Sequence, residues 1–272
     1  MVRTPFHGQP LTPFARYQPS LSDPLFESST ARWFRSQVGP SRLFTYERSQ
    51  FDVVIAPTQG RGTHEVDFET AHLDRHHWLY IRAGQAHRWG PSTYEADLIL
   101  LQPAGSSVHW QPGPRTIVFT DAQLADVAPL LEFINVQREH ADPVVMSTTR
   151  DLIFEWLRLG ERDVKLEPLC MDFRNLLEVR VTDVRTVDHY AKLLGCTTRE
   201  LVDSCRKARC AHPKKMIEQA LLLEAKRLLT QPNGSVGAVA SFLGFDEARF
   251  ARFFRRAEGQ RLDSWIAQHQ LG

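Results

Sequence analysis

The 272-residue chain lacks any apolar run of the roughly 18 residues that a transmembrane helix requires. Its first residues, MVRTPFHGQPLTPFARYQPS, are rich in proline and lack the apolar core of a secretory signal. We therefore predict a cytoplasmic protein without a membrane partner, whose residues 1–24 form a mobile arm. The apolar content of 42% and charged content of 24% are typical of a globular protein with room for two domains.

Cysteine is scarce, and its spacing excludes a disulfide framework. The chain has four cysteines (Cys170, Cys196, Cys205 and Cys210) and no CxxC pair. Reduced thiols are expected of such a protein. Cys205, Cys210 and His212 supply two sulfurs and one nitrogen, which leaves a tetrahedral zinc site one ligand short. We predict no metal and no cofactor.

Excess charge of one sign is also absent, since the net charge is +1, but the charges are unevenly distributed. From Asp183 to the end there are 15 Lys and Arg against 10 Asp and Glu, whereas residues 1–182 hold 18 against 22. A basic C-terminal third indicates a polyanion partner. A basic solvated face without a partner is the alternative.

Residues from about 40 to 120 have the pattern of short strands. FDVVIAPTQGRGTHEVDF contains two β-rich runs around a glycine turn, which predicts a hairpin. HHWLYIRAGQAHRW and ADLILLQPAGSSVHW repeat the style, and RTIVF closes the series. Short strands with frequent turns favour a sandwich or a small barrel.

After Pro143 the apolar spacing becomes helical. STTRDLIFEWLRLG and LEPLCMDFRNLLEVR predict two helices, the second starting near Pro168. Their apolar stripes comprise Leu152, Ile153, Trp156 and Leu159 in the first, and Leu169, Phe173, Leu176 and Leu177 in the second. These helices would either pack on a core or form a subunit contact.

A repeat with an offset of 49 residues dominates the C-terminal third. Val187, Tyr190, Ala191 and Leu194 correspond to Val236, Val239, Ala240 and Leu243. Thr186 and Ser235 are positioned as N-caps, and Gly195 and Gly244 as left-handed helix ends. Thr197 and Asp246 would cap a second helix in each copy. Each copy is therefore predicted to be a helix-turn-helix, with two ordinary helical hairpins as the alternative.

The second helix of the C-terminal copy combines rings and guanidinium groups. Phe250, Phe253 and Phe254 would face inward. Ala248, Arg249, Arg252 and Arg256 would face outward. A small residue lets a helix approach the major groove, and arginine forks suit guanine edges and phosphates. Between the copies, PKKMIEQALLLEAKRLL predicts one unbroken helix over 213–229.

These motifs resemble the AraC/XylS family of bacterial transcription regulators. HYAKLLGCTTREL, LLLEAKRLL and SVGAVASFLGF followed by RFARFFRRAEG carry the resemblance over residues 183–266. GRGTHEVDFETAHLDRHHWLYIRAGQAHRW looks like the family's effector-binding cupin barrel. The resemblance implies an α+β multidomain protein: an arm (1–24), a cupin-like β-barrel (25–142), a helical linker that forms the dimer contact (143–182) and an all-α double helix-turn-helix domain (183–272).

The family's recognition positions fall on Arg199, Val202 and Asp203 in the first unit and on Ala248, Arg249 and Arg252 in the second. Arg206 and Arg256 complete the predicted DNA contacts. Asp203 departs from the family pattern, which often has arginine or a neutral polar residue there. A carboxylate at this position would repel phosphate, although it could accept a hydrogen bond from cytosine N4. Only four residues separate Phe245 from Phe250, where the family usually has five, and Leu262 replaces a usual proline.

Cupins also include metal-dependent enzymes, and this stretch offers His64, His72, His76, His77, His87 and His109. No HxH-then-Glu spacing is present, and adjacent His76 and His77 would face opposite sides of a strand. A sensor pocket is therefore favoured over a catalytic site, with His87 and Trp89 as candidate lining residues. A surface histidine and a structural tryptophan are the alternative interpretation.

The sequence thus predicts a non-enzymatic, dimeric transcription regulator that binds double-stranded promoter DNA and a small-molecule effector, with RNA polymerase as a further candidate partner. One alternative is a cupin-type metal-dependent enzyme or small-molecule binding protein with structural C-terminal helices. Another is a protein-binding helical module in place of the DNA-binding one.

Overall fold

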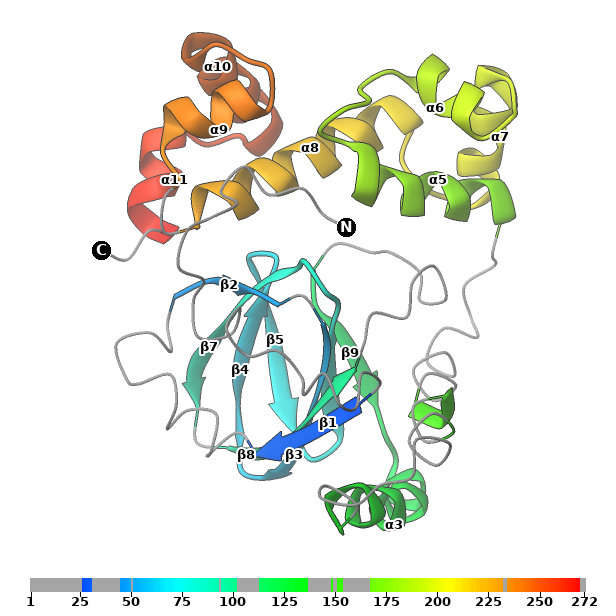
Figure 1. Ribbon diagram of the computed structural model, residues 1–272, viewed down its shortest axis with the longest axis vertical. Helices are drawn as coiled ribbons and strands as arrows, with labels where there is room; N and C mark the ends of the chain where they lie inside the picture. Colours follow the sequence, from blue (N-terminus) through cyan, green and yellow to red (C-terminus); the bar gives the residue numbers. More distant parts are fainter. Residues whose placement is uncertain are drawn as a thin grey trace. The chain divides into compact units, whose positions relative to one another are not determined.

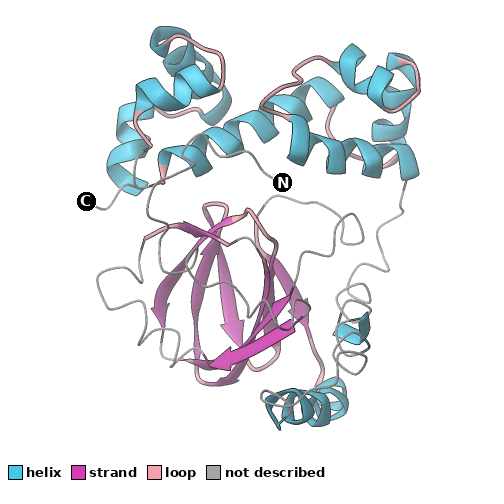
Figure 2. Ribbon diagram, viewed as in Figure 1, coloured by secondary structure: helices cyan, strands magenta, loops and turns pink. Residues whose placement is uncertain are grey.

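The structure is a computed structural model that describes residues 26–30, 45–49, 51–92, 94–101, 113–136, 148, 151–153, 167–231 and 234–269 (Figure 1). The predicted arm, His109, Trp156 and Leu159 lie outside these residues. The described chain divides into a β unit, up to residue 153, and a helical unit, from residue 167. Figure 2 shows this segregation of strands and helices, which is the predicted α+β architecture.

The β unit is one curled antiparallel sheet, a half-barrel (Figure 1). Its strands run in the order β1-β8-β3-β6-β5-β4-β7-β2, and β9 pairs with β6. The strands are β1 (Phe26–Thr30), β2 (Glu47–Arg48), β3 (Asp52–Gln59), β4 (Arg61–Val66), β5 (Glu69–Asp74), β6 (His77–Ile81), β7 (Ala86–Ser92), β8 (Glu95–Leu101) and β9 (Arg115–Val118).

The hairpin predicted within 51–68 is wrong. β3 pairs with β6 and β8, whereas β4 pairs with β5 and β7. The first six residues of β3 are all buried, as expected of a central strand that pairs on both edges and is covered on both faces. β4 instead forms a hairpin with β5 through Asp67 and Phe68, whose φ angles are 51° and 72°. Positive φ at both central residues is the requirement of a type I′ turn, which usually employs glycine or asparagine.

Buried contacts hold Asp67 in this left-handed conformation. Its carboxylate accepts hydrogen bonds from Gln85 Nε2 at 2.7 Å and from the Ala86 amide at 3.1 Å. Its own amide donates to the Ala86 carbonyl at 2.7 Å. Aspartate tolerates the left-handed region better than most residues, and these three hydrogen bonds to Gln85 and Ala86 stabilise that conformation here.

The sheet buries apolar side chains on both faces. Val53 and Ile55 of β3 join one cluster, and Val54 and Ala56 join the other. Helix α3 (Asp121–Val136) covers the second cluster, where Val127 is buried. The sequence pattern predicts no helix here. Ile153 packs into the same cluster, while the neighbouring Leu152, predicted on the same stripe, is 43% exposed.

The helical unit consists of seven described helices. They are α5 (Pro168–Arg180), α6 (Val187–Leu193), α7 (Thr198–Lys207), α8 (Pro213–Leu229), α9 (Val236–Phe242), α10 (Glu247–Glu258) and α11 (Leu262–His269). The predicted bounds of the helix over 213–229 are confirmed. The α5 helix packs on α7 and α8, and the Phe173 and Tyr190 rings meet edge to face at 5.2 Å. No described helix is long and apolar enough to cross a bilayer.

A buried tyrosine–aspartate pair should stabilise the β unit. The Tyr80 hydroxyl donates to Asp52 Oδ2 at 2.7 Å, and both residues are buried. Tyr80→Phe deprives a buried carboxylate of a donor, so we expect the free energy of unfolding to fall by about 1–3 kcal/mol. Urea denaturation followed by tryptophan fluorescence measures the change.

Tyr190→Phe is the matched control for this prediction. The Tyr190 hydroxyl is buried in the helical unit without a hydrogen-bond partner among the described residues. Its removal should leave stability nearly unchanged. Equal losses in the two variants would contradict the assigned role of the Asp52 contact.

Candidate nucleic-acid interface and buried histidine cluster

Each copy of the repeat begins with the same cap. The Thr186 hydroxyl accepts a hydrogen bond from the His189 amide at 3.3 Å, and the Ser235 hydroxyl accepts one from the Ala238 amide at 3.3 Å. A hydroxyl in this position satisfies one of the free amides of the first helical turn. The predicted N-caps of both short helices are confirmed.

The tight turn after each short helix is also repeated. Gly195 and Gly244 have φ angles of 64° and 65°, the left-handed conformation that a helix end requires. Thr197 then caps α7 in a capping box with Glu200, and the Asp246 carboxylate accepts from the Arg249 amide at 2.8 Å to cap α10. The two copies are therefore helix-turn-helix units built by equivalent local interactions.

The second helix of each unit is fixed by a buried apolar face. Leu201 and Cys205 of α7 are fully buried, as are the equivalent Phe250 and Phe254 of α10. The Phe254 ring also contacts the buried Trp265 of α11 at 5.5 Å. The sequence pattern does not predict α11, which begins at Leu262, where the family pattern has proline.

With its rings buried, α10 exposes Ala248, Arg249, Arg252 and Arg256. Arg249 pairs with Asp246 at 3.2 Å, and Arg256 pairs with Glu218 of α8 at 3.0 Å. Within the described chain, Arg252 has no carboxylate in ion-pair range. Exposed ion pairs are weak and exchange readily, so all three guanidinium groups are available to an external anion.

The equivalent face of α7 carries less positive charge. Arg199 and Arg206 are exposed, whereas Val202 and Asp203 are half-buried. Arg206 Nη2 lies 2.9 Å from Asp203 Oδ1, so the carboxylate of Asp203 lowers the net positive charge of the α7 face. The structure therefore brings the eight predicted DNA-contact residues onto two helices of unequal charge.

His87 and Trp89 both lie on β7 and are buried, at 1% and 5% exposure. The expectation of a surface histidine therefore fails for His87. Its Nδ1 lies 3.2 Å from Nε2 of the fully buried His64 on β4. The His64 ring also meets Trp89 edge to face at 5.0 Å, and Trp89 stacks on Tyr94 at 6.0 Å. The sequence does not single out His64 as a lining residue of the predicted sensor pocket.

Burial sets the protonation of this histidine cluster. Desolvation lowers the pKa of His87 to about 4, and it lowers the pKa of His64 well below the ordinary value, with help from the neighbouring His87. A charged imidazole loses its hydration inside the sheet, so the neutral form is favoured. At neutral pH the cluster offers hydrogen bonds and aromatic surface without positive charge.

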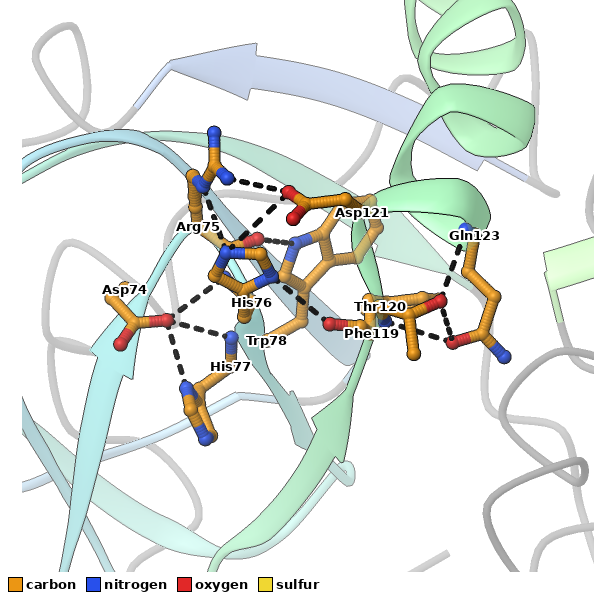
Figure 3. A network of polar contacts seen from close by, with 9 residues as sticks. All are labelled: Asp74, Arg75, His76, His77, Trp78, Phe119, Thr120, Asp121 and Gln123. Carbon is orange, nitrogen blue, oxygen red and sulfur yellow. Dashed lines mark hydrogen bonds and ion pairs between the residues drawn. The ribbon is translucent and has the colours of Figure 1, made fainter.

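His76 and His77 have separate structural contacts. Figure 3 shows His76 in the turn after β5 and His77 at the start of β6, with His77 Nδ1 lying 2.8 Å from Asp74 and His76 Nδ1 lying 3.0 Å from the Phe119 carbonyl. The hydrogen bond from His77 lowers the pKa of Asp74. This network joins the turn to the start of α3. Among the described residues, no three His, Cys, Asp or Glu side chains gather as a metal site would need.

Residues 190–268 match a protein family described as "Helix-turn-helix domain". No curated protein matches the chain. Among solved structures, ToxT from Vibrio cholerae is similar with 9% identity and a TM-score of 0.45, covering 91% of this chain and 100% of that one. ToxT bound to an unsaturated fatty acid is similar with 9% identity and a TM-score of 0.40, and the match covers 89% of this chain and 94% of that one. The AraC-like transcriptional activator CuxR is similar with 11% identity and a TM-score of 0.30, and the match covers 78% of this chain and 75% of that one. TM-scores below 0.5 are too low to support a conclusion about this chain.

The histidine cluster should make the β unit sensitive to acid. Below about pH 6.5 the unfolded imidazoles bind protons while the folded ones stay neutral, so the free energy of unfolding falls as pH decreases. The loss from His87 should reach about 3 kcal/mol near pH 4, where the folded group also protonates, and His64 acts in the same direction. Urea denaturation of the full chain at several pH values measures the slope.

Two variants identify the residue responsible. His87→Gln should flatten the slope between pH 6.5 and 4, whereas His72→Gln, which changes an exposed imidazole on β5, should preserve it. A slope that is the same in wild type and His87→Gln would contradict a neutral buried histidine.

Proposed function

Because residues 190–268 form an AraC-type helix-turn-helix domain, we propose that the chain is a sequence-specific DNA-binding transcription regulator that responds to a small molecule bound in the β unit. The helical unit recognises the promoter, and the β unit supplies the response. The protein acts in the cytoplasm, as a dimer and without enzymatic activity. The predicted dimer contact within 147–180 and the contact with RNA polymerase belong to this proposal.

The proposal rests on the outward face of α10 and on the equivalent helix α7 in the other unit. α8 joins the two units and contacts α6 and α7 as well as α9 and α10 (Figure 1). Its 17 residues span about 25 Å at about 1.5 Å each. Successive major-groove segments on one face of a duplex are about 34 Å apart. Two reading helices flanking such a rod can therefore reach adjacent segments of the groove.

Arg252 is the strongest candidate for direct base readout. It is exposed on α10 one turn after Ala248, whose small side chain permits close approach to the groove floor. A guanidinium fork can donate two hydrogen bonds to O6 and N7 of guanine. Arg249 and Arg256 first have to exchange a carboxylate partner for DNA, whereas Arg252 does not.

The effector site is assigned to the cluster of His64, His87 and Trp89. These residues come from the paired strands β4 and β7, so the sheet positions them together. Two neutral imidazoles and an indole favour an uncharged molecule with a flat face and hydrogen-bonding groups. Binding there would stabilise one arrangement of β4 and β7, which gives a ligand a means of shifting a population of conformations.

Arg252→Ala tests the readout assignment. We expect specific promoter binding to weaken by about 1–3 kcal/mol while binding to random DNA changes less. Fluorescence anisotropy with promoter fragments and random duplexes, titrated with salt, measures both affinities. Arg61→Ala, which removes an exposed arginine from the β unit, is the matched control and should bind as wild type does.

The same titration tests the function as a whole. Wild-type protein that binds no promoter fragment better than random DNA at physiological salt would contradict sequence-specific regulation. An unchanged affinity in Arg252→Ala would remove only this residue from the set of base contacts.

A further inference from the structure

A cavity of about 400 Å³ opens between the segment before α6, helix α8 and helix α10. We call it the notch. Five cations line it: Arg185, Lys214, Arg249, Arg252 and Arg256. Its apolar part includes the rings of Phe245 and Phe253. The single acidic residue among the lining residues is Glu218, which is engaged by Lys215 and Arg256.

Arg185 is the most constrained cation of the notch. Its guanidinium donates to the Leu243 carbonyl, at the end of α9, and lies over the Phe245 ring at 4.9 Å. Burial lowers the pKa of this guanidinium, yet no described carboxylate pairs with it. A cation that is partly removed from water without a counter-charge is costly, and an external anion would offset that cost.

The remaining lining cations divide into paired and unpaired groups. Arg249 and Arg256 are paired with Asp246 and Glu218. Lys214 and Arg252 are exposed and, in the part of the chain that the structure describes, form no ion pair. Together with Arg185, they leave three positive charges around the notch without a carboxylate partner.

We propose that the notch binds a phosphate group, and that its occupant is a backbone phosphate of the duplex bound by the helix-turn-helix units. Phosphate oxygens accept hydrogen bonds from guanidinium forks and from a lysine ammonium group, so they suit this set of donors. Arg249 and Arg252 belong both to the notch and to the outer face of α10. DNA that contacts α10 therefore brings phosphates to the notch. The inference rests on the proposed function.

The notch also connects the two helix-turn-helix units. Arg185 precedes α6 of the first unit, and its Nη2 would lie 3.6 Å from a Cβ atom added at Gly244, in the turn of the second. A phosphate held by Arg185 and Lys214 would thus contact the segments that start the first unit and the α8 rod. This contact assigns Lys214 and Arg185 as positioning residues that fix the register of the duplex without reading bases.

Lys214→Gln in the full chain tests the proposal, and Lys215→Gln is the matched control. Both residues are exposed in the first turn of α8, but only Lys214 lines the notch. Anisotropy titrations between about 50 and 200 mM salt give the slope of log affinity against log salt. We expect Lys214→Gln to lower the magnitude of that slope by about 0.9, the value for one lost phosphate contact. The affinity should fall by the same factor for promoter and random duplexes.

Lys214→Arg should retain the wild-type slope, and Lys215→Gln should change it much less than Lys214→Gln does. Equal slopes in Lys214→Gln and wild type would overturn the inference, provided that wild type prefers promoter DNA. Absence of that preference in wild type would instead refute the proposed function, so the two failures are distinguishable.

Competition with inorganic phosphate distinguishes the two sources of the anion. If DNA supplies the phosphate, inorganic phosphate should displace the duplex no better than chloride at equal ionic strength. Stronger displacement that is lost in Lys214→Gln would overturn the DNA assignment and identify a free phosphate as the occupant.

Discussion

The helical unit depends on the packing of α8, which serves as a shared core for two small domains. Met216, Ile217, Leu221 and Leu228 are buried, as is most of this helix. Even its charged residues Glu224 and Arg227 are buried, with their ion-pair atoms 3.6 Å apart. A three-helix segment is too small to bury enough apolar surface alone, so each unit completes its core on the common rod.

This constraint explains the composition of α10. Its rings provide the apolar area that anchors the helix to α8, α9 and α11, and Phe245 extends the cluster by stacking on Phe253 at 5.3 Å. Once that face is buried, helical geometry places the arginines outside. The ion pairs to Asp246 and Glu218 moderate their mutual repulsion. The α7 face has a lower net positive charge because it carries Asp203, so it is expected to contribute less to the attraction of DNA.

Local chemistry made the repeat predictable from the sequence. The helix caps and turn glycines form contacts within a few residues of their own position, so their spacing was sufficient to locate the helices. These residues are Thr186, Ser235, Gly195 and Gly244. Strand pairing is not local, and the glycine turn between β3 and β4 was mistaken for a hairpin because the true partners of β3 lie farther along the chain. His64 was missed as a neighbour of His87 for the same reason, since it requires the β4–β7 register. The capping pattern of Thr120 and Gln123 was the available signal that α3 begins here. Pro129, which lies inside this helix, argued against a helix in the sequence.

We propose that α8 holds two reading helices against adjacent major-groove segments on one face of the duplex. Hydroxyl-radical footprinting of a bound promoter fragment tests it most directly. We expect two protected patches per protein chain, separated by about one helical turn, 10 to 10.5 base pairs. A single patch, or two patches on opposite faces of the duplex, would contradict it.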